Sequence, residues 1–261
     1  MSNRFNNIWI EKYRPKTLND IILTKENRNF FSSIKDEIPH LLFVGPPGIG
    51  KSSAARIIVE DIMKCQYLYI NASDENGIDT IRSKVTSFSQ TKSIDGKIKV
   101  VILDEADGIS AEGMRALRNT MEEYSARTRF ILTANYKHKI IPAIQSRTQS
   151  IDLTPPFNDV VNRMVEIVKQ EKVKVDADQK QNFIELIKQY SPDIRSIINN
   201  IQKASVTGEF ILSSKVNNTT IIDNIHNHIQ SKKSLKLRKY LIERESEFQG
   251  DYHSLMKQYL N

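Results

Sequence analysis

Three of the chain's nine glycines lie within six positions, and a lysine and a serine follow them directly. A chain that uses glycine so sparingly gathers it where the backbone must approach a ligand closely. The spacing is that of a phosphate-binding loop (P-loop), in which backbone N–H groups surround phosphates, the lysine reaches the β- and γ-oxygens and the serine ligates Mg²⁺. The loop consists of Gly45, Pro46, Pro47, Gly48, Ile49, Gly50, Lys51 and Ser52. The alternative, a turn rich in Gly and Pro, is disfavoured because a strand pattern precedes the segment and a helical pattern follows it.

Two carboxylates follow another hydrophobic run, at 99–103. Beside a P-loop, this position suits Asp104 to hold the Mg²⁺ shell and Glu105 to polarise the attacking water. Taken alone, the segment fits a buried strand that ends in an acidic turn. The next strand pattern ends in Thr133 and Asn135, and Asn135 is placed to hold the water against the γ-phosphate. An ordinary strand-end turn explains that feature equally well.

These side chains need a framework, and the hydrophobic pattern provides it. Short β-rich runs alternate with longer helical patterns, which predicts βαβ units and a parallel sheet covered on both faces. The runs occupy 40–44, 66–70, 98–103, 129–134 and 149–153. From 157 to about 212 the periodicity is helical only, and its clearest helix spans 192–203, with Ser191 as N-cap and Pro192 in the first turn.

Composition narrows the function without identifying it. Hydrophobic residues make up 39% of the chain and charged ones 26%, which is typical of a folded globular protein. The formal charge of +7 favours an anionic partner. The single cysteine excludes an internal disulfide and suits a reducing compartment. We expect no transmembrane segment and no secretion signal, and hence a location in the cytoplasm or, in a eukaryote, the nucleus.

Motifs along residues 9–202 resemble the ATPase subunits of sliding-clamp loaders, in a consistent order. The family includes replication factor C small subunits and the ATPase subunit of tailed-phage loaders, all within the AAA+ superfamily. Besides the P-loop, the motifs are Glu11-Lys-Tyr-Arg-Pro15, Asn71-Ala-Ser-Asp74, Asp104-Glu-Ala-Asp107, Thr133-Ala-Asn135 and Ser146-Arg147. The resemblance implies an α/β AAA+ P-loop NTPase with a five-stranded parallel sheet at 1–154, a helical lid at 155–215 and a partial helical collar at 216–261.

The resemblance also assigns roles in binding ATP and Mg²⁺. Tyr13 and Arg14 would border the adenine pocket, and Thr133 and Asn135 would form the first sensor. Arg147 would be an arginine finger that reaches a neighbouring subunit's site, and Arg195 would be the second sensor. On residue chemistry alone, both arginines fit solvated surface charges, and Tyr13 fits a core position equally well.

Three features depart from the family pattern. Thr148 follows Arg147 where the family usually has cysteine, and Leu23-Thr-Lys stands in place of Gly-Gln or Gly-His after Asp20-Ile-Ile. Third, only 221–261 remain for the collar. We therefore expect that this chain alone does not form a stable closed ring.

The expected function is ATP-dependent loading of a ring-shaped clamp at primer-template junctions. The implied partners are the sliding clamp, the other loader subunits of a hetero-oligomer (a pentamer in the family) and primer-template DNA, without a membrane. DNA contacts are expected from the helices that follow Asp79 and Ala111, through Arg82, Lys84, Arg115 and Arg118. The alternatives are another AAA+ DNA-remodelling motor, such as a branch-migration helicase, and a non-hydrolysing scaffold subunit of the same loader.

Overall fold

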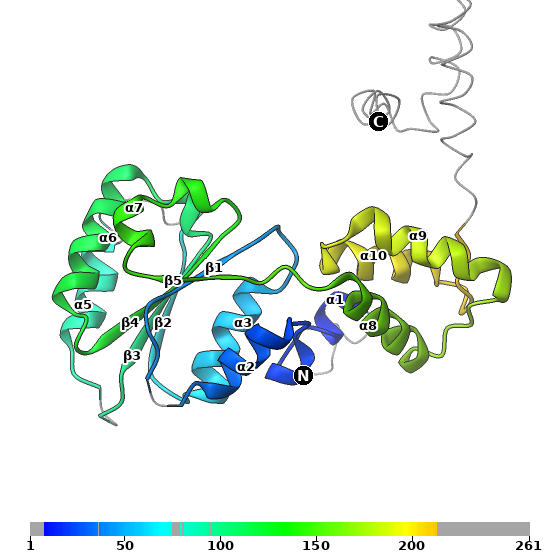
Figure 1. Cartoon of the computed structure of the whole chain (residues 1–261), viewed down its shortest axis with the longest axis horizontal. Coiled ribbons are helices and arrows are strands. Elements are labelled where there is room, and N and C mark those ends of the chain that lie inside the picture. The colour runs from blue at the N-terminus through cyan, green and yellow to red at the C-terminus, as the bar shows by residue number, and fades with distance from the viewer. Residues whose placement is uncertain (1–7, 36, 75–78, 80, 94–95, 213–261) are drawn as a thin grey trace, which may run out of the picture. The chain divides into compact units, whose positions relative to one another are not determined.

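The computed structural model describes residues 8–35, 37–74, 79, 81–93 and 96–212. Five parallel strands form one sheet in the order β2-β3-β4-β1-β5 (Figure 1). They are β1 (Leu41–Val44), β2 (Tyr67–Asn71), β3 (Lys99–Asp104), β4 (Thr128–Ala134) and β5 (Gln149–Asp152). Four of them are runs of mostly hydrophobic residues, as a sheet covered on both faces requires, whereas the edge strand β5 buries Ile151 alone. All five predicted strands are present, and every predicted end lies within one residue of the observed one.

Strand register brings the predicted polar side chains to one edge of the sheet. Val44, which precedes the P-loop, pairs with Ala134, and Asp104 pairs with Asn71. Because all the strands are parallel, their carboxyl ends meet at this edge, where α/β sheets bind ligands.

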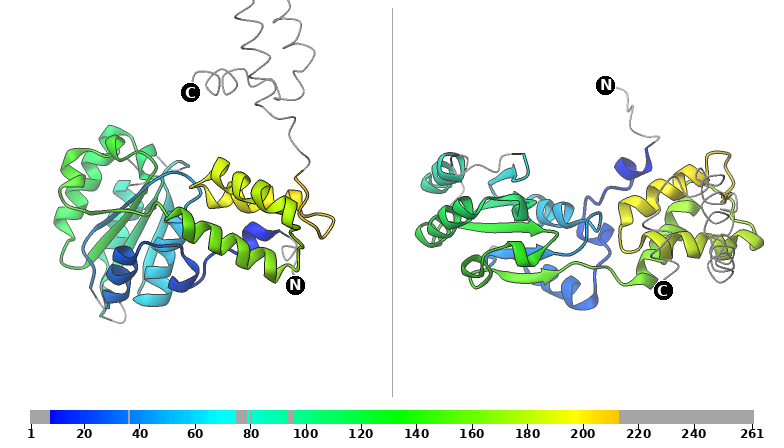
Figure 2. Two further views of the ribbon diagram at one scale, coloured as in Figure 1. Left: turned by 45° about the vertical axis from the view of Figure 1, so that its right-hand side comes forward. Right: turned by 90° about the horizontal axis from the view of Figure 1, so that it is seen from above.

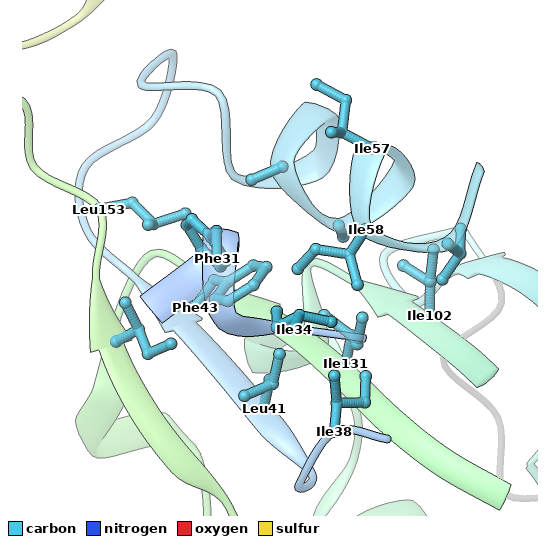
Figure 3. Close-up of a cluster of buried hydrophobic side chains, with 14 of the residues drawn as sticks. Phe31, Ile34, Ile38, Leu41, Phe43, Ile57, Ile58, Ile102, Ile131 and Leu153 are labelled. Carbon is cyan, nitrogen blue, oxygen red and sulfur yellow. The ribbon is translucent and has the colours of Figure 1, made fainter. Parts of the chain in front are cut away.

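Alternate residues of the strands pack on opposite faces of the sheet. Leu41 and Phe43 face a cluster formed with α2 (Lys25–Ser33), α3 (Lys51–Ile57) and the π-helical turn η2 (Ile58–Ile62), which Figure 3 shows. Leu42 belongs to the opposite cluster, beneath η3 (Ile81–Val85), α5 (Thr86–Gln90), α6 (Ala111–Glu123) and α7 (Pro142–Gln145). Helices therefore cover both faces of the sheet (Figure 2). Burying each Leu, Ile or Phe side chain stabilises the fold by about 1.5–3 kcal/mol.

The segment after β5 is largely helical. It contains α8 (Phe157–Gln170), η6 (Ala177–Gln179), α9 (Lys180–Tyr190) and α10 (Ile194–Ala204). An isolated parallel bridge pairs Lys174 with Glu209, so the expectation of helix only was wrong at that point. None of the helices in the described ranges is long and apolar enough to span a bilayer.

Helix α10 starts two residues later than predicted. Its N-cap is Asp193, whose carboxylate accepts hydrogen bonds from the Ser196 amide at 3.0 Å and the Ser196 hydroxyl at 2.8 Å. Ser191 and Pro192 therefore precede the helix, because the Asp193 carboxylate caps its first turn in place of the predicted Ser191. The predicted isoleucine stripe is present, with Ile197, Ile198 and Ile201 buried.

The N-terminal segment packs against this helical region. Helix α1 (Trp9–Lys12) lies beside α8 and α10 (Figure 1), and the Trp9 amide donates to Oε1 of Gln202 at 3.0 Å. The 3-10 helices η1 (Leu18–Asp20), η4 (Ala106–Gly108) and η5 (Lys137–Lys139) complete the described elements. The predicted collar at 216–261 lies outside the described residues, and the domain boundaries remain a prediction.

Candidate active site

A cavity of about 480 Å³ opens at the carboxyl edge of the sheet. Its walls come from the P-loop, the ends of β3 and β4, the N-terminal segment and helices α8 and α10. The predicted site residues that line it are Tyr13, Arg14, Pro47, Gly48, Ile49, Gly50, Lys51, Ser52, Asp104, Glu105, Thr133, Asn135 and Arg195. Residues from four separate predicted motifs therefore share one cavity.

Lys51 is buried at the base of this cavity. Its Nζ donates at 2.8 Å to each of three acceptors, the carbonyl oxygens of Gly45 and Pro46 and the Oδ1 of Asn135. Burial lowers the pKa of Lys51, and the negative charges of Asp104, Asp107 and Glu105 oppose that shift. Asn135, which directly follows β4, is thus hydrogen-bonded to the P-loop lysine.

Hydroxyl groups orient the carboxylate of Asp104. Ser52 and Thr133 donate to Oδ1 at 2.8 and 2.5 Å, and Tyr69 donates to Oδ2 at 2.6 Å. Asp104 ends the buried strand β3, and the register places Thr133 on the neighbouring strand. A hydroxyl and a carboxylate are the hard oxygen donors that Mg²⁺ prefers, so Ser52 and Asp104 fit the predicted metal site.

Glu105 has an unusual backbone conformation directly after this strand. Its φ of 54° and ψ of 42° lie in the left-handed region, which costs a non-glycine residue about 1–3 kcal/mol. The Glu105 amide donates to Oγ1 of Thr133 at 2.9 Å, which helps to hold this turn. The exposed Glu105 side chain lines the cavity beside Asp104.

The start of α10 meets the P-loop. A Cβ built on Gly48, whose φ is +76°, would lie 1.7 Å from Oδ1 of Asp193. The Arg195 amide also donates to the Gly48 carbonyl oxygen at 3.4 Å. The glycine therefore lets the helix that carries Arg195 come against the loop.

The N-terminal wall of the cavity is bonded to Glu171, the residue that caps the C-terminal end of α8. Glu171 accepts a hydrogen bond from the Tyr13 hydroxyl at 2.5 Å and forms an ion pair with Lys12 at 2.6 Å. Burial and the bond to Glu171 raise the pKa of Tyr13. Burial acts to raise the pKa of Glu171, but the bonds from Lys12 and Tyr13 outweigh it and lower that pKa.

Arg147 lies away from this cavity. It follows α7 and forms an ion pair with Glu122 at the end of α6, and its Nη1 donates to the Ala143 carbonyl oxygen at 2.7 Å. Glu122 also lies 4.0 Å from Nε of Arg118. The predicted arginine finger is thus held on the outer side of α6, with one of the predicted DNA-contact residues.

The other predicted DNA-contact residues lie on separate elements. Arg115 on α6 and Lys84 in η3 are exposed, whereas the apolar side of α6 is buried through Met114, Leu117 and Met121. The side chain of Arg82 is outside what the structure describes.

Several cavity residues were missed in the sequence. Tyr69, Arg163 and Ile198 line the cavity, and Asp193 touches the loop. Strand alternation gives a signal for Tyr69, because it lies two residues before Asn71 and therefore on the face that carries Asp104. Arg163 and Asp193 approach the cavity through tertiary packing, so local spacing gives no signal for them.

One edge of the parallel sheet carries a P-loop, two adjacent carboxylates and the polar residues that end a neighbouring strand. This combination defines a P-loop ATPase. The family model described as "ATPase family associated with various cellular activities (AAA)" matches residues 41–155. This match confirms the predicted fold class.

Similar proteins define the family within that class. The chain is 44% identical to the replication factor C small subunit of Sulfolobus acidocaldarius over 79% of this chain and 65% of that protein. It is 46% identical to the Saccharolobus solfataricus counterpart, over 77% of this chain and 63% of that protein. It is 39% identical to the Methanococcus vannielii counterpart, over 82% of this chain and 68% of that protein. The chain belongs to the replication factor C small-subunit family, one of the two groups of clamp-loader subunits that the motifs resemble. It spans just under two thirds of the length of the first two of these relatives.

Proposed function

We propose that this chain is an ATPase subunit of a sliding-clamp loader, which uses ATP and Mg²⁺ to open a ring-shaped clamp and place it at primer-template junctions. The observation that carries the proposal is the joining of Lys51 to Asn135 and of Ser52 to Asp104 in one cavity, in a chain of the replication factor C small-subunit family. A non-hydrolysing scaffold subunit would not need this arrangement.

In this proposal the P-loop amides and Lys51 bind the phosphates, and Ser52 and Asp104 hold Mg²⁺. When bound, Mg²⁺ would supply positive charge that offsets the negative charge of the phosphates. Glu105 takes a proton from the attacking water, and Asn135 orients that water. Thr133 holds both residues, because its hydroxyl donates to the Asp104 carboxylate and accepts from the Glu105 backbone amide.

The arginines divide between the chain's own site and a neighbour's. Arg195 lines the chain's own cavity, which supports a role as a sensor of the γ-phosphate. Arg147 lies on another surface, which supports a role in the site of an adjacent subunit. Tyr13 and Arg14 also line the cavity and would border the adenine.

The proposed partners are the clamp, primer-template DNA and other loader subunits, which form a pentamer in the family. DNA contact would be made through Arg82, Lys84, Arg115 and Arg118, whose positive charges suit the phosphate backbone. The activity would take place where DNA is replicated, in the cytoplasm of a bacterial host or in a nucleus.

The test is ATP hydrolysis by the chain assembled with its partner subunits, measured with and without clamp and primer-template DNA. A clamp loader should be stimulated most by both together, and Glu105→Gln subunits provide the matched control. Stimulation by DNA regardless of the clamp would favour a remodelling motor, and absence of hydrolysis would favour a scaffold subunit. Either result would overturn the proposal.

A further inference from the structure

Tyr69 differs from the other residues that bond Asp104, because it comes from β2 and approaches the opposite carboxylate oxygen. Ser52 and Thr133 both donate to Oδ1, whereas the Tyr69 hydroxyl donates to Oδ2 at 2.6 Å. Donors on both oxygens fix the rotation of a carboxylate about its last side-chain bond. Tyr69 therefore restrains a movement that the two donors to Oδ1 leave free.

A second residue holds the Tyr69 ring in place. The guanidinium carbon of Arg56 lies 4.1 Å from the ring centroid, a distance at which a cation is attracted to the face of an aromatic ring. Arg56 and Ser52 are four residues apart on α3 and so share one side of that helix. Among the described residues, none accepts a hydrogen bond from the buried Nε of Arg56, which is consistent with packing against the ring.

We propose that Tyr69, held by Arg56, is a positioning residue that sets the orientation of the Asp104 carboxylate for Mg²⁺. The inference rests on the proposed nucleotide site and deepens it. Tyr69 does not touch the reacting atoms in this scheme; it acts through Asp104. Residues that hydrogen-bond to metal-site carboxylates typically change metal affinity 10- to 100-fold when they are altered.

The chain provides a matched control two residues earlier on the same strand. Tyr67 also lies on the α3 side of the sheet, but its hydroxyl donates to Glu60, outside the cavity. Tyr67→Phe and Tyr69→Phe each remove one hydroxyl that donates to a carboxylate. They differ in whether that carboxylate is Asp104.

The test is equilibrium binding of a fluorescent ADP to the full chain. Binding is measured first without Mg²⁺, in EDTA, and then in EDTA-free samples with increasing Mg²⁺ up to saturation. Tyr69→Phe should raise the Mg²⁺ concentration for half-maximal binding about tenfold. It should leave affinity in EDTA unchanged, because the P-loop is intact. Tyr67→Phe should behave like the unaltered chain in both conditions. A purely structural effect of Tyr69→Phe would instead weaken nucleotide binding equally with and without Mg²⁺.

An unchanged Mg²⁺ requirement in Tyr69→Phe would overturn this inference and leave the proposed function standing. If the unaltered chain shows no Mg²⁺-dependent nucleotide binding, the proposed site and this inference fail together. Should Tyr69→Phe not fold, Arg56→Met decides the question, because it keeps the hydroxyl and removes the cation over the ring. A higher Mg²⁺ requirement in that variant supports the role, and an unaltered one rejects it.

Discussion

The carboxylate of Asp193 lies directly against Gly48, so the N-cap of α10 and the middle of the phosphate-binding loop share one contact. Any side chain at position 48 would overlap this carboxylate, since a Cβ there comes within 1.7 Å of Oδ1. The same carboxylate caps α10 through the Ser196 amide. Arg195 is therefore positioned by a residue that also touches the loop.

Gly48→Ala should weaken nucleotide binding by about tenfold or more, because the methyl group drives α10 from the loop and a φ of +76° strains alanine by about 1–2 kcal/mol. Calorimetric titration with ATP analogues would measure the change. The double variant Gly48→Ala with Asp193→Ser should recover part of the affinity, since serine still caps the helix but is smaller. Equal affinity in the single and double variants would contradict the contact as the cause.

Glu105→Gln should keep ATP binding and reduce turnover by about 10²- to 10⁴-fold, because it removes the base and leaves the loop intact. Lys51→Ala should instead lose nucleotide binding, since its ammonium is held at the base of the cavity. Binding and single-turnover measurements on the same preparations separate the two effects. Undiminished turnover in Glu105→Gln would reject this residue as the base.

Arg147→Ala subunits should be inactive on their own but regain activity when mixed with Lys51→Ala subunits, because each would supply what the other lacks. An arginine finger contributes roughly 10³- to 10⁵-fold in rate. The ion pair with Glu122 must open before Arg147 reaches a neighbour, so Glu122→Gln should not abolish activity. Mixed assemblies no more active than either variant would remove support for action between subunits.

His40 should make stability depend on pH between about 4 and 6.5. Burial, assisted by Arg129, lowers the pKa of His40 from 6.5 to about 4, and its Nδ1 accepts a hydrogen bond from the Phe130 amide at 3.1 Å. Because the unfolded chain binds the proton more readily, stability is complete above pH 6.5 and falls as the pH drops toward 4. Allowing for the partial exposure of the ring, the loss is about 2 kcal/mol.

Denaturant unfolding at a series of pH values would check this. His40→Asn keeps an acceptor for the Phe130 amide without titrating, so its stability should vary less across the range. The exposed His138→Asn is the control and should retain the full dependence. A slope shared by all three proteins would assign the effect to other groups.

The sheet and the P-loop were predictable because their signals are local. A run such as Val100 to Leu103 has few alternatives to a buried strand, and strand order then brings Asp104 beside Thr133. The start of α10 was mistaken because Ser191 and Asp193 both have side chains that cap helices, and spacing does not choose between them. Tyr69 and the ion pair between Glu122 and Arg147 were missed because they depend on partners far along the chain.

The bond between Trp9 and Gln202 joins positions 193 residues apart, and Lys12 and Tyr13 reach Glu171 in the same region. Contacts of such sequence separation form late, because the entropy of closing a long loop must first be overcome. During synthesis, the sheet and phosphate-binding loop can form before these partners leave the ribosome, whereas Lys12 and Tyr13 must wait for Glu171 and Trp9 must wait for Gln202. A nascent chain therefore forms its phosphate-binding loop before the N-terminal wall of the cavity, which is proposed to border the adenine base.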